Sequence, residues 1–199
     1  MKVIRPFGPS IGMFKLEPSI FKTLNKDCEH VTKADNFSKY DYSKGLIGQI
    51  KLQARFSDLA LHEVEKYFVN TAKKFAKDVF NAEISLKIQD AWYNRTRQPR
   101  EYNPEHIHPQ SLLTSVGYLA LPKGFEKLKD HPSEMERGGG LELFHGENLN
   151  FSHTKNTIFP VVKDFFVFPA YLRHAVHPMP KSITGERRSF SVNFINTSE

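Results

Sequence analysis

The segment RRSFSVNF, residues 187–194, alternates polar and apolar side chains as a β-strand does. Successive side chains of an extended chain point to opposite faces, so the polar side chains share one face. That face carries Arg187, Ser189, Ser191 and Asn193. The other face carries Arg188, Phe190, Val192 and Phe194, and its aromatic rings need protein to cover them. A polar inner face is typical of a cavity that holds a polar ligand, although a solvated face would give the same pattern.

RRSFSVNF is the last of several β-rich runs that begin near residue 84 and are separated by Pro, Gly, Asn and Asp. The runs are ISLKIQDAWYN (84–94), SLLTSVGYLAL (111–121), GLELF (140–144), NTIFPVV (156–162), DFFVFP (164–169) and RSFSVNFIN (188–196). Many short strands with turn residues between them predict a sandwich or jelly roll.

The first third of the chain is predicted to be helical instead. Residues 57–80, SDLALHEVEKYFVNTAKKFAKDVF, place apolar side chains three and four residues apart, and Ser57 is a candidate N-cap. A weaker helical pattern covers 17–31, while KGLIGQIKL (44–52) could be a short strand or a loop. We therefore expect one domain, 1–199, mainly β, in which helices of a support region, 1–83, cover one sheet of a β-rich core, 84–196.

Composition narrows the chemistry of any site. The 199 residues include one cysteine, Cys28, which excludes an internal disulfide and a zinc site built on thiolates, so a metal would need His, Asp or Glu. The net charge is +6, but the Lys and Arg residues are interleaved with acidic residues and form no evident basic stripe. Nucleic-acid binding is therefore possible but not indicated. The sequence shows neither a signal-peptide pattern nor a run of the roughly 18 apolar residues that a membrane span needs. We therefore expect no membrane partner and a cytoplasmic location.

Two pairs of polar side chains could form a ligand site. EHIHP, residues 105–109, places His106 and His108 on one face of an extended chain, where both imidazoles could reach one metal ion. However, two histidines on the solvent-exposed face of a strand, with no metal, would give the same sequence pattern. Arg187 and Ser189 have the same spacing, and a guanidinium and a hydroxyl so placed can together bind a carboxylate.

The order of these motifs along the chain is informative. The His pair precedes a strand that contains Tyr118, a Gly-rich link leads to LELF, and FPAYLRHAVHP (168–178) places His174 thirteen residues before Arg187. In this order the chain resembles the 2-oxoglutarate- and iron(II)-dependent dioxygenase superfamily, whose double-stranded β-helix carries an H-x-D pair, a distal His and an R-x-S pair. It looks most like the prolyl-hydroxylase-like branch common in phage and marine bacterial genomes. The resemblance covers about residues 84–196.

The resemblance implies roles for particular residues. His106 and His174 match two metal ligands, Arg187 and Ser189 match the pair that binds the far carboxylate of 2-oxoglutarate, and Tyr118 matches a position that can add a hydroxyl to that carboxylate. His108 departs from the pattern, because the superfamily usually has Asp there. The third ligand is therefore open. His108 could complete a three-histidine site, Glu105 or Gln110 could replace it, or His108 could support the other ligands while water fills the vacancy.

The implied protein is a jelly-roll enzyme, cupin-like in shape, that uses Fe(II), O₂ and 2-oxoglutarate to hydroxylate a C–H bond with release of succinate and CO₂. Its substrate could be a protein side chain, a nucleobase or a small metabolite, and its oligomeric state is open. One alternative is a three-histidine cupin-type metalloenzyme that does not use 2-oxoglutarate, against which Arg187 and Ser189 argue. Another is a non-enzymatic jelly-roll module. If the source is viral, the expected location is the host cytoplasm.

Several segments outside these motifs could shape the site. NRTRQPREYNP (94–104) and KGFEKLKDHPSEMERGGG (123–140) are predicted to be loops, either of which could cover the substrate, and the glycines at 138–140 are expected to form a flexible link. His177 is expected near the mouth of the site. Trp92 and Tyr93 alternate, so one should be in the core and the other should face the pocket or solvent.

Overall fold

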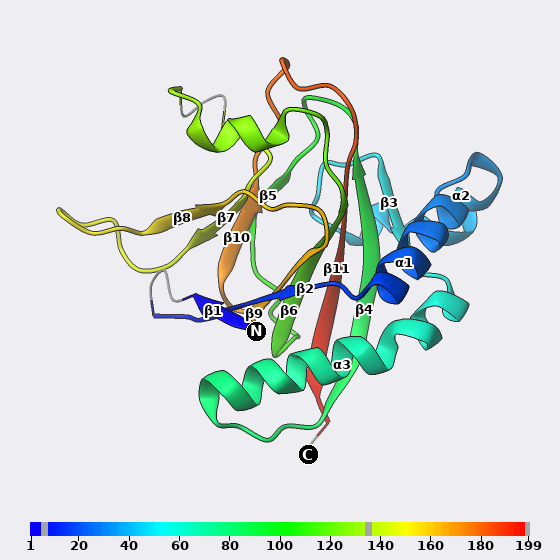
Figure 1. The fold of residues 1–199 in the computed structure, drawn as a ribbon, viewed down its shortest axis with the longest axis horizontal. Helices are drawn as coiled ribbons and strands as arrows, with labels where there is room; N and C mark the ends of the chain where they lie inside the picture. Colours follow the sequence, from blue (N-terminus) through cyan, green and yellow to red (C-terminus); the bar gives the residue numbers. More distant parts are fainter. Residues whose placement is uncertain (5–7, 134–136, 198–199) are drawn as a thin grey trace.

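The computed structural model describes residues 1–4, 8–133 and 137–197, and these form two antiparallel sheets with helices on one side (Figure 1). The larger sheet has the strand order β1-β2-β9-β6-β11-β4-β3, and the smaller has the order β5-β10-β7-β8. The strands are β1 (Lys2–Ile4), β2 (Ile11–Lys15), β3 (Leu52–Arg55), β4 (Leu86–Thr96), β5 (Asn103–His106), β6 (Leu113–Ala120), β7 (Leu141–Phe144), β8 (Lys155–Ile158), β9 (Asp164–Pro169), β10 (Arg173–Val176) and β11 (Arg187–Asn196). The helices are α1 (Pro18–Val31), α2 (Ala34–Tyr40) and α3 (Asp58–Phe80), with 3₁₀ turns η1 (Ser43–Gly45) and η2 (Phe125–Asp130).

Strand β9 shows how the layers are arranged. Phe165 and Val167 belong to the core that the large sheet shares with α1 and α3. Phe166 and Phe168, which alternate with them, belong to a second core between the two sheets. Two facing sheets with helices on the outer face of one of them form a jelly roll, or double-stranded β-helix, so the predicted fold class is confirmed.

Helix α3 forms as its sequence predicts. The Ser57 hydroxyl accepts a hydrogen bond from the Ala60 N–H at 3.2 Å, which satisfies one of the free donors of the first turn. The buried face is made of Ala60, Val64, Phe68, Ala72, Phe75 and Ala76. Asn81 ends the helix with a φ of 52°, a left-handed conformation that asparagine tolerates. The weaker pattern at 17–31 is also a helix, α1.

Strand β11 occupies the centre of the large sheet, between β6 and β4. Its apolar face is fully buried, and the Phe190 ring packs near Phe68 and Phe165. Gly117 of β6 lies opposite Phe190, and a Cβ there would come within 2.2 Å of the ring, so this pairing requires glycine. Because the helices cover the apolar face, the polar face of β11 must look toward the smaller sheet.

Parts of the N-terminal third and of the long loop differ from expectation. Three strands, β1, β2 and β3, come from the region expected to be helical and extend both edges of the large sheet. Most of 44–52 is irregular, and β3 begins only at Leu52. Within 123–140, whose residues 134–136 lie outside the described part, Phe125 and Leu128 are buried against Met179, because η2 turns its apolar side chains inward.

The glycines at 138–140 also differ from the flexible link that was expected, because they make close, specific contacts. A Cβ on Gly138 would come within 1.8 Å of the Pro178 carbonyl oxygen, so this glycine lets two backbones touch. Gly139 has a φ of 86°, and its N–H donates to the His177 carbonyl at 3.0 Å. These contacts hold the start of β7 in place. In the described part of the chain, no helix has both the length and the apolar character needed to cross a membrane.

Candidate active site

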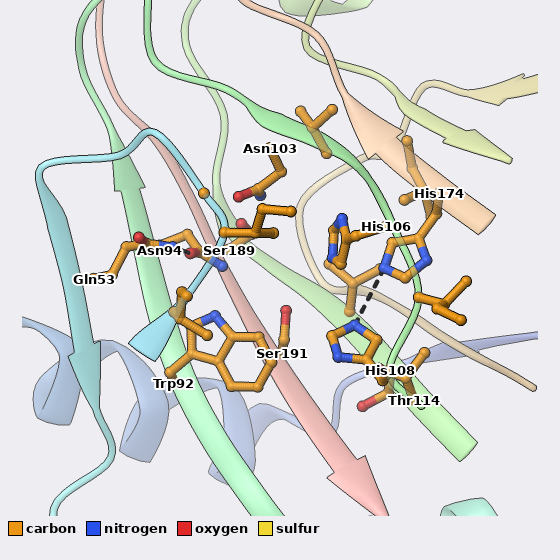
Figure 2. A pocket seen from close by; sticks show the side chains of 18 of the residues that line it. Gln53, Trp92, Asn94, Asn103, His106, His108, Thr114, His174, Ser189 and Ser191 are labelled. Atoms are coloured by element: carbon orange, nitrogen blue, oxygen red, sulfur yellow. Dashed lines mark hydrogen bonds between the residues drawn. The ribbon is translucent and has the colours of Figure 1, made fainter. Parts of the chain in front are cut away.

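The two sheets enclose a cavity of about 260 Å³. Side chains from β4, β5, β6, β10 and β11 line it, and the segment 45–48 forms part of its rim. Figure 2 shows His106, His108 and His174 gathered on one side of the cavity, with Ser189 and Ser191 on the strand opposite. The polar side chains of β11 and the three histidines therefore line the same cavity inside the jelly roll.

Strand pairing brings the three histidines together. His106 of β5 is the direct cross-strand partner of His174 on β10. His108 follows β5, and its backbone N–H donates to the Ala170 carbonyl at 3.0 Å, which fixes the extended path of the chain. One ring nitrogen from each residue lies within 4.8 Å of the other two. Nitrogens about 2 Å from one ion lie roughly 3 Å apart, so a small inward movement would let the three rings share a metal.

Hydrogen bonds hold two of the rings in one tautomer. His106 Nδ1 lies 2.7 Å from the Pro104 carbonyl oxygen, and His174 Nδ1 lies 2.8 Å from that of Leu172. A carbonyl only accepts, so both Nδ1 atoms carry the proton and both Nε2 atoms keep a free lone pair. This is the arrangement typical of histidine metal ligands.

Burial keeps the three imidazoles uncharged. It lowers the pKa of His106 and, more strongly, that of His174. Burial, together with repulsion from His106, lowers the pKa of His108 to about 4. A neutral imidazole is the form that binds a metal, so these histidines can accept an ion without first losing a proton.

Arg187 lies in the same cavity and is 1% exposed. Its Nη1 donates to the Ser189 hydroxyl at 3.2 Å, its Nη2 lies 3.5 Å from the Tyr118 hydroxyl, and its Nε has no partner. Within the described residues no carboxylate pairs with this guanidinium. A buried charge without a counter-ion is costly, so the site suits a small anion such as a carboxylate.

Tyr118 supports the guanidinium from β6. Its ring centroid lies 5.1 Å from the guanidinium carbon of Arg187, and its hydroxyl is buried. Burial raises the pKa of Tyr118, although Arg187 opposes the shift, so the phenol stays protonated and can donate to an anion. Arg187, Ser189 and Tyr118 are therefore brought together as a set of donors around one point.

Part of the cavity rim is made by a segment to which the sequence analysis gave no role in the site. Gly45, Leu46, Ile47 and Gly48 line it. The buried Glu101 carboxylate joins this rim to the 94–104 segment, accepting hydrogen bonds from the backbone N–H groups of Lys51, Arg97 and Gln98. A Cβ on Gly48 would meet the Asn103 amide oxygen at 2.2 Å, so this glycine lets the rim lie close to β5.

The remaining predicted residues lie in different places. Trp92 lines the cavity, while Tyr93 is in the core, as their alternation predicted. The carboxylate of Glu105 is not part of the group of side chains that could hold a metal ion, and it forms an ion pair with Arg173 at 2.8 Å instead. Gln110 is exposed in the turn after His108. His177 lies 2.9 Å from Glu142 on β7 and does not line the cavity.

Several polar side chains in or beside the cavity wall were not assigned a role from the sequence. Those that line the cavity include Gln53, Asn94, Asn103, Thr114 and Ser115, while Asn193 contacts His108 without lining the cavity. Asn193 could have been found, because it continues the polar alternation of β11. The others depend on strand pairings that no local pattern reveals.

Three neutral imidazoles beside a buried guanidinium that has no carboxylate partner among the described residues fit an enzyme of the metal- and oxo-acid-dependent class. Residues 90–193, more than half of the chain, match the family model described as "Putative 2OG-Fe(II) oxygenase". The chain therefore belongs to the 2OG-Fe(II) oxygenase family, whose enzymes use iron(II), 2-oxoglutarate and O₂. The resemblance seen in the motifs is confirmed at this level, and the phage and marine bacterial branch stays a prediction.

Solved structures share the fold at low identity. A Pseudomonas putida prolyl-4-hydroxylase has 13% identity and a TM-score of 0.59, covering 93% of this chain and 91% of that one. A Trichoplax adhaerens prolyl hydroxylase, in complex with a hypoxia inducible factor peptide, has 14% identity and a TM-score of 0.56, covering 94% and 83%. HygX from Streptomyces hygroscopicus, with nickel, 2-oxoglutarate and hygromycin B bound, has 10% identity and a TM-score of 0.59, covering 94% and 83%. No curated protein sequence matches the chain.

Proposed function

We propose that His106, His108 and His174 bind the iron(II), and that Arg187, Ser189 and Tyr118 bind the far carboxylate of 2-oxoglutarate. The observation that carries this proposal is the buried guanidinium of Arg187, which has no carboxylate partner among the described residues and shares one cavity with the three histidines. A dicarboxylic acid supplies that counter-ion at one end and a metal ligand at the other.

Each part of the chain has its own task in this proposal. Bound iron(II) supplies the centre at which O₂ and 2-oxoglutarate react and the substrate is oxidised. The three neutral imidazoles orient the ion but leave its double positive charge uncompensated, so the co-substrate carboxylate contributes charge as well as a ligand. Arg187 fixes the far end of the co-substrate, and the aromatic and aliphatic wall, including Trp92 and Phe168, limits the access of water.

This assignment explains the site better than the two alternatives do. A cupin-type enzyme that does not use 2-oxoglutarate has no need of a buried arginine without an acidic partner. A non-enzymatic module has no need of three neutral histidines, one buried and two half-buried, whose nitrogens converge. The two features together favour an oxygenase that hydroxylates a C–H bond and releases succinate and CO₂.

The substrate enters, in this proposal, at the rim beside the metal. Ile47 is 53% exposed and Ile107 is 41% exposed, and both line the cavity, so the mouth offers apolar contact to a carbon chain. Two of the structural neighbours are prolyl hydroxylases, and HygX holds hygromycin B, so a peptide and a small metabolite both suit this fold. A nucleobase remains a third candidate, and the cytoplasm remains the predicted location.

The protein is expected to release succinate slowly from 2-oxoglutarate even without its main substrate, because consumption of 2-oxoglutarate would not be strictly coupled to oxidation of that substrate. The test is to reconstitute the protein anaerobically with Fe(II) and 2-oxoglutarate, admit O₂ and measure succinate, with Arg187→Ala as the control. Protein that contains iron and binds 2-oxoglutarate but forms no more succinate than the control would contradict the proposal. Added Pro-containing peptides, nucleosides or amino acids would then identify the substrate class by the stimulation they give.

A further inference from the structure

His108 is held differently from the other two histidines. Its Nδ1 lies 3.2 Å from the side-chain nitrogen of Asn193, whereas His106 and His174 each direct Nδ1 at a backbone carbonyl oxygen. The Asn193 oxygen in turn accepts from the Thr114 hydroxyl at 2.7 Å. Thr114 is 1% exposed and Asn193 is 5% exposed, so water does not compete for these hydrogen bonds.

The direction of these bonds fixes where the His108 proton is. An amide nitrogen only donates, so His108 Nδ1 must accept, and the ring proton must be on Nε2. That Nε2 lies 3.3 Å from His174 Nε2, which is free to accept because the His174 proton is on Nδ1. Figure 2 shows this contact between the two rings. All the donors therefore run one way, from Thr114 through Asn193 and His108 to His174.

This chain of donors is incompatible with a metal on His108. To bind an ion through Nε2, His108 must move its proton to Nδ1, where it would face the Asn193 amide hydrogens. Rotating the amide by half a turn removes the conflict, because oxygen and nitrogen then exchange places. The Asn193 oxygen would accept from His108 Nδ1, and the amide nitrogen would donate to the Thr114 hydroxyl, which can also accept.

We propose that Asn193 is a positioning residue whose amide turns over when metal binds, switching His108 from the tautomer that donates to His174 to the one that coordinates the ion. The inference rests on the proposed role of His108 as a ligand. An amide suits this position because it offers either a donor or an acceptor in the same place. In a site without an acidic ligand, Asn193 also supplies the polar support that His106 and His174 take from the backbone.

The first test observes the tautomers directly. Zinc serves as a diamagnetic probe, and long-range ¹H–¹⁵N correlation spectra of histidine-labelled protein report which ring nitrogen carries the proton, with His108→Gln used to assign the signals. We expect His108 to be protonated on Nε2 without metal and on Nδ1 with zinc, while His106 and His174 keep the proton on Nδ1. An unchanged His108 tautomer in zinc-loaded protein would overturn the inference.

The second test uses two replacements of similar size. Asn193→Leu removes the acceptor, and it should weaken zinc binding by about 10- to 100-fold, the usual cost of losing such a partner. Asn193→Asp keeps an acceptor for His108 Nδ1 and for the Thr114 hydroxyl, so it should bind zinc at least as tightly as the unaltered protein. Asn70→Leu, at an exposed position of α3, is the control, and thermal melting confirms that each variant is folded.

The outcomes separate this inference from the proposed function. If the unaltered protein binds no zinc at the three histidines, the metal site fails and the inference fails with it. If the unaltered protein and folded Asn193→Leu bind zinc with equal affinity, the metal site stands and only the role of Asn193 is overturned. A loss in Asn193→Leu that Asn193→Asp does not recover would also count against it, since a packing defect would explain the loss.

Discussion

Replacing Arg187 with alanine is expected to weaken 2-oxoglutarate binding by about 30-fold or more, because truncating one partner of a buried charge-assisted pair costs roughly 2–5 kcal/mol. The guanidinium is 1% exposed, and the donors beside it, Ser189 and Tyr118, are neutral. Neither can replace its charge. Isothermal titration of 2-oxoglutarate into metal-loaded protein measures the change.

Arg188→Ala is the matched control, because Arg188 leaves β11 on the opposite face. Its guanidinium forms ion pairs with Glu29 of α1 and with Glu186, outside the cavity. Loss of these pairs should lower the melting temperature and leave the 2-oxoglutarate affinity within about threefold, since each contributes to stability and not to the site. Equal losses of affinity in the two variants would show that the strand presents the wrong arginine to the co-substrate.

Replacing His106 or His174 with alanine is expected to abolish metal binding. Each supplies one of three convergent ring nitrogens, and losing a direct ligand costs more than the roughly 10- to 100-fold that follows loss of an outer partner. Chelator competition with a spectroscopically visible metal measures the affinity. Metal binding within tenfold of normal in His174→Ala would contradict the proposed ligand set, because His174 is the most deeply buried of the three.

His108→Asp is the sharper variant of this set. If His108 occupies the position at which the superfamily usually has Asp, the carboxylate should keep or strengthen iron binding, because it adds a negative charge to the divalent ion. His108→Ala is the paired control and should lose affinity. Unchanged affinity in His108→Ala would mean that His108 is not a ligand, and a loss in His108→Asp as large as that in His108→Ala would mean that His108 does not occupy the carboxylate position.

The sequence contained enough information to predict the chemistry of the cavity wall but not its rim. Strand β11 is long and has a strict period of two, so the polar face with Arg187 and Ser189 could be read directly, while its position in a cavity and not in solvent was indicated only by the motif resemblance. The pairing of His106 with His174 could not be read from local pattern, because β5 and β10 have only four residues each. The motif resemblance supplied that link instead.

The structure of the rim and of several other segments could not be predicted from the sequence. Residues 45–48 are irregular, and the residues that follow them are held by distant partners, because the Gln49 N–H donates to the Tyr102 carbonyl and the Lys51 N–H donates to the Glu101 carboxylate. The strands β1 and β2 were missed because their few residues gain stability only from pairing at the edge of a completed sheet. Loop 123–140 was judged by its many charges, although the structure buries its Phe125 and Leu128.

The most direct test of the central claim, that iron(II) and 2-oxoglutarate bind together between His106, His108, His174 and Arg187, is an anaerobic titration. Fe(II) and then 2-oxoglutarate are added to the purified protein while the visible absorbance is recorded. We predict that the weak charge-transfer band of the chelate appears and saturates at one co-substrate per iron, and that Arg187→Ala needs a much higher concentration to reach it. Iron-loaded protein that shows no band at saturating 2-oxoglutarate would contradict the account.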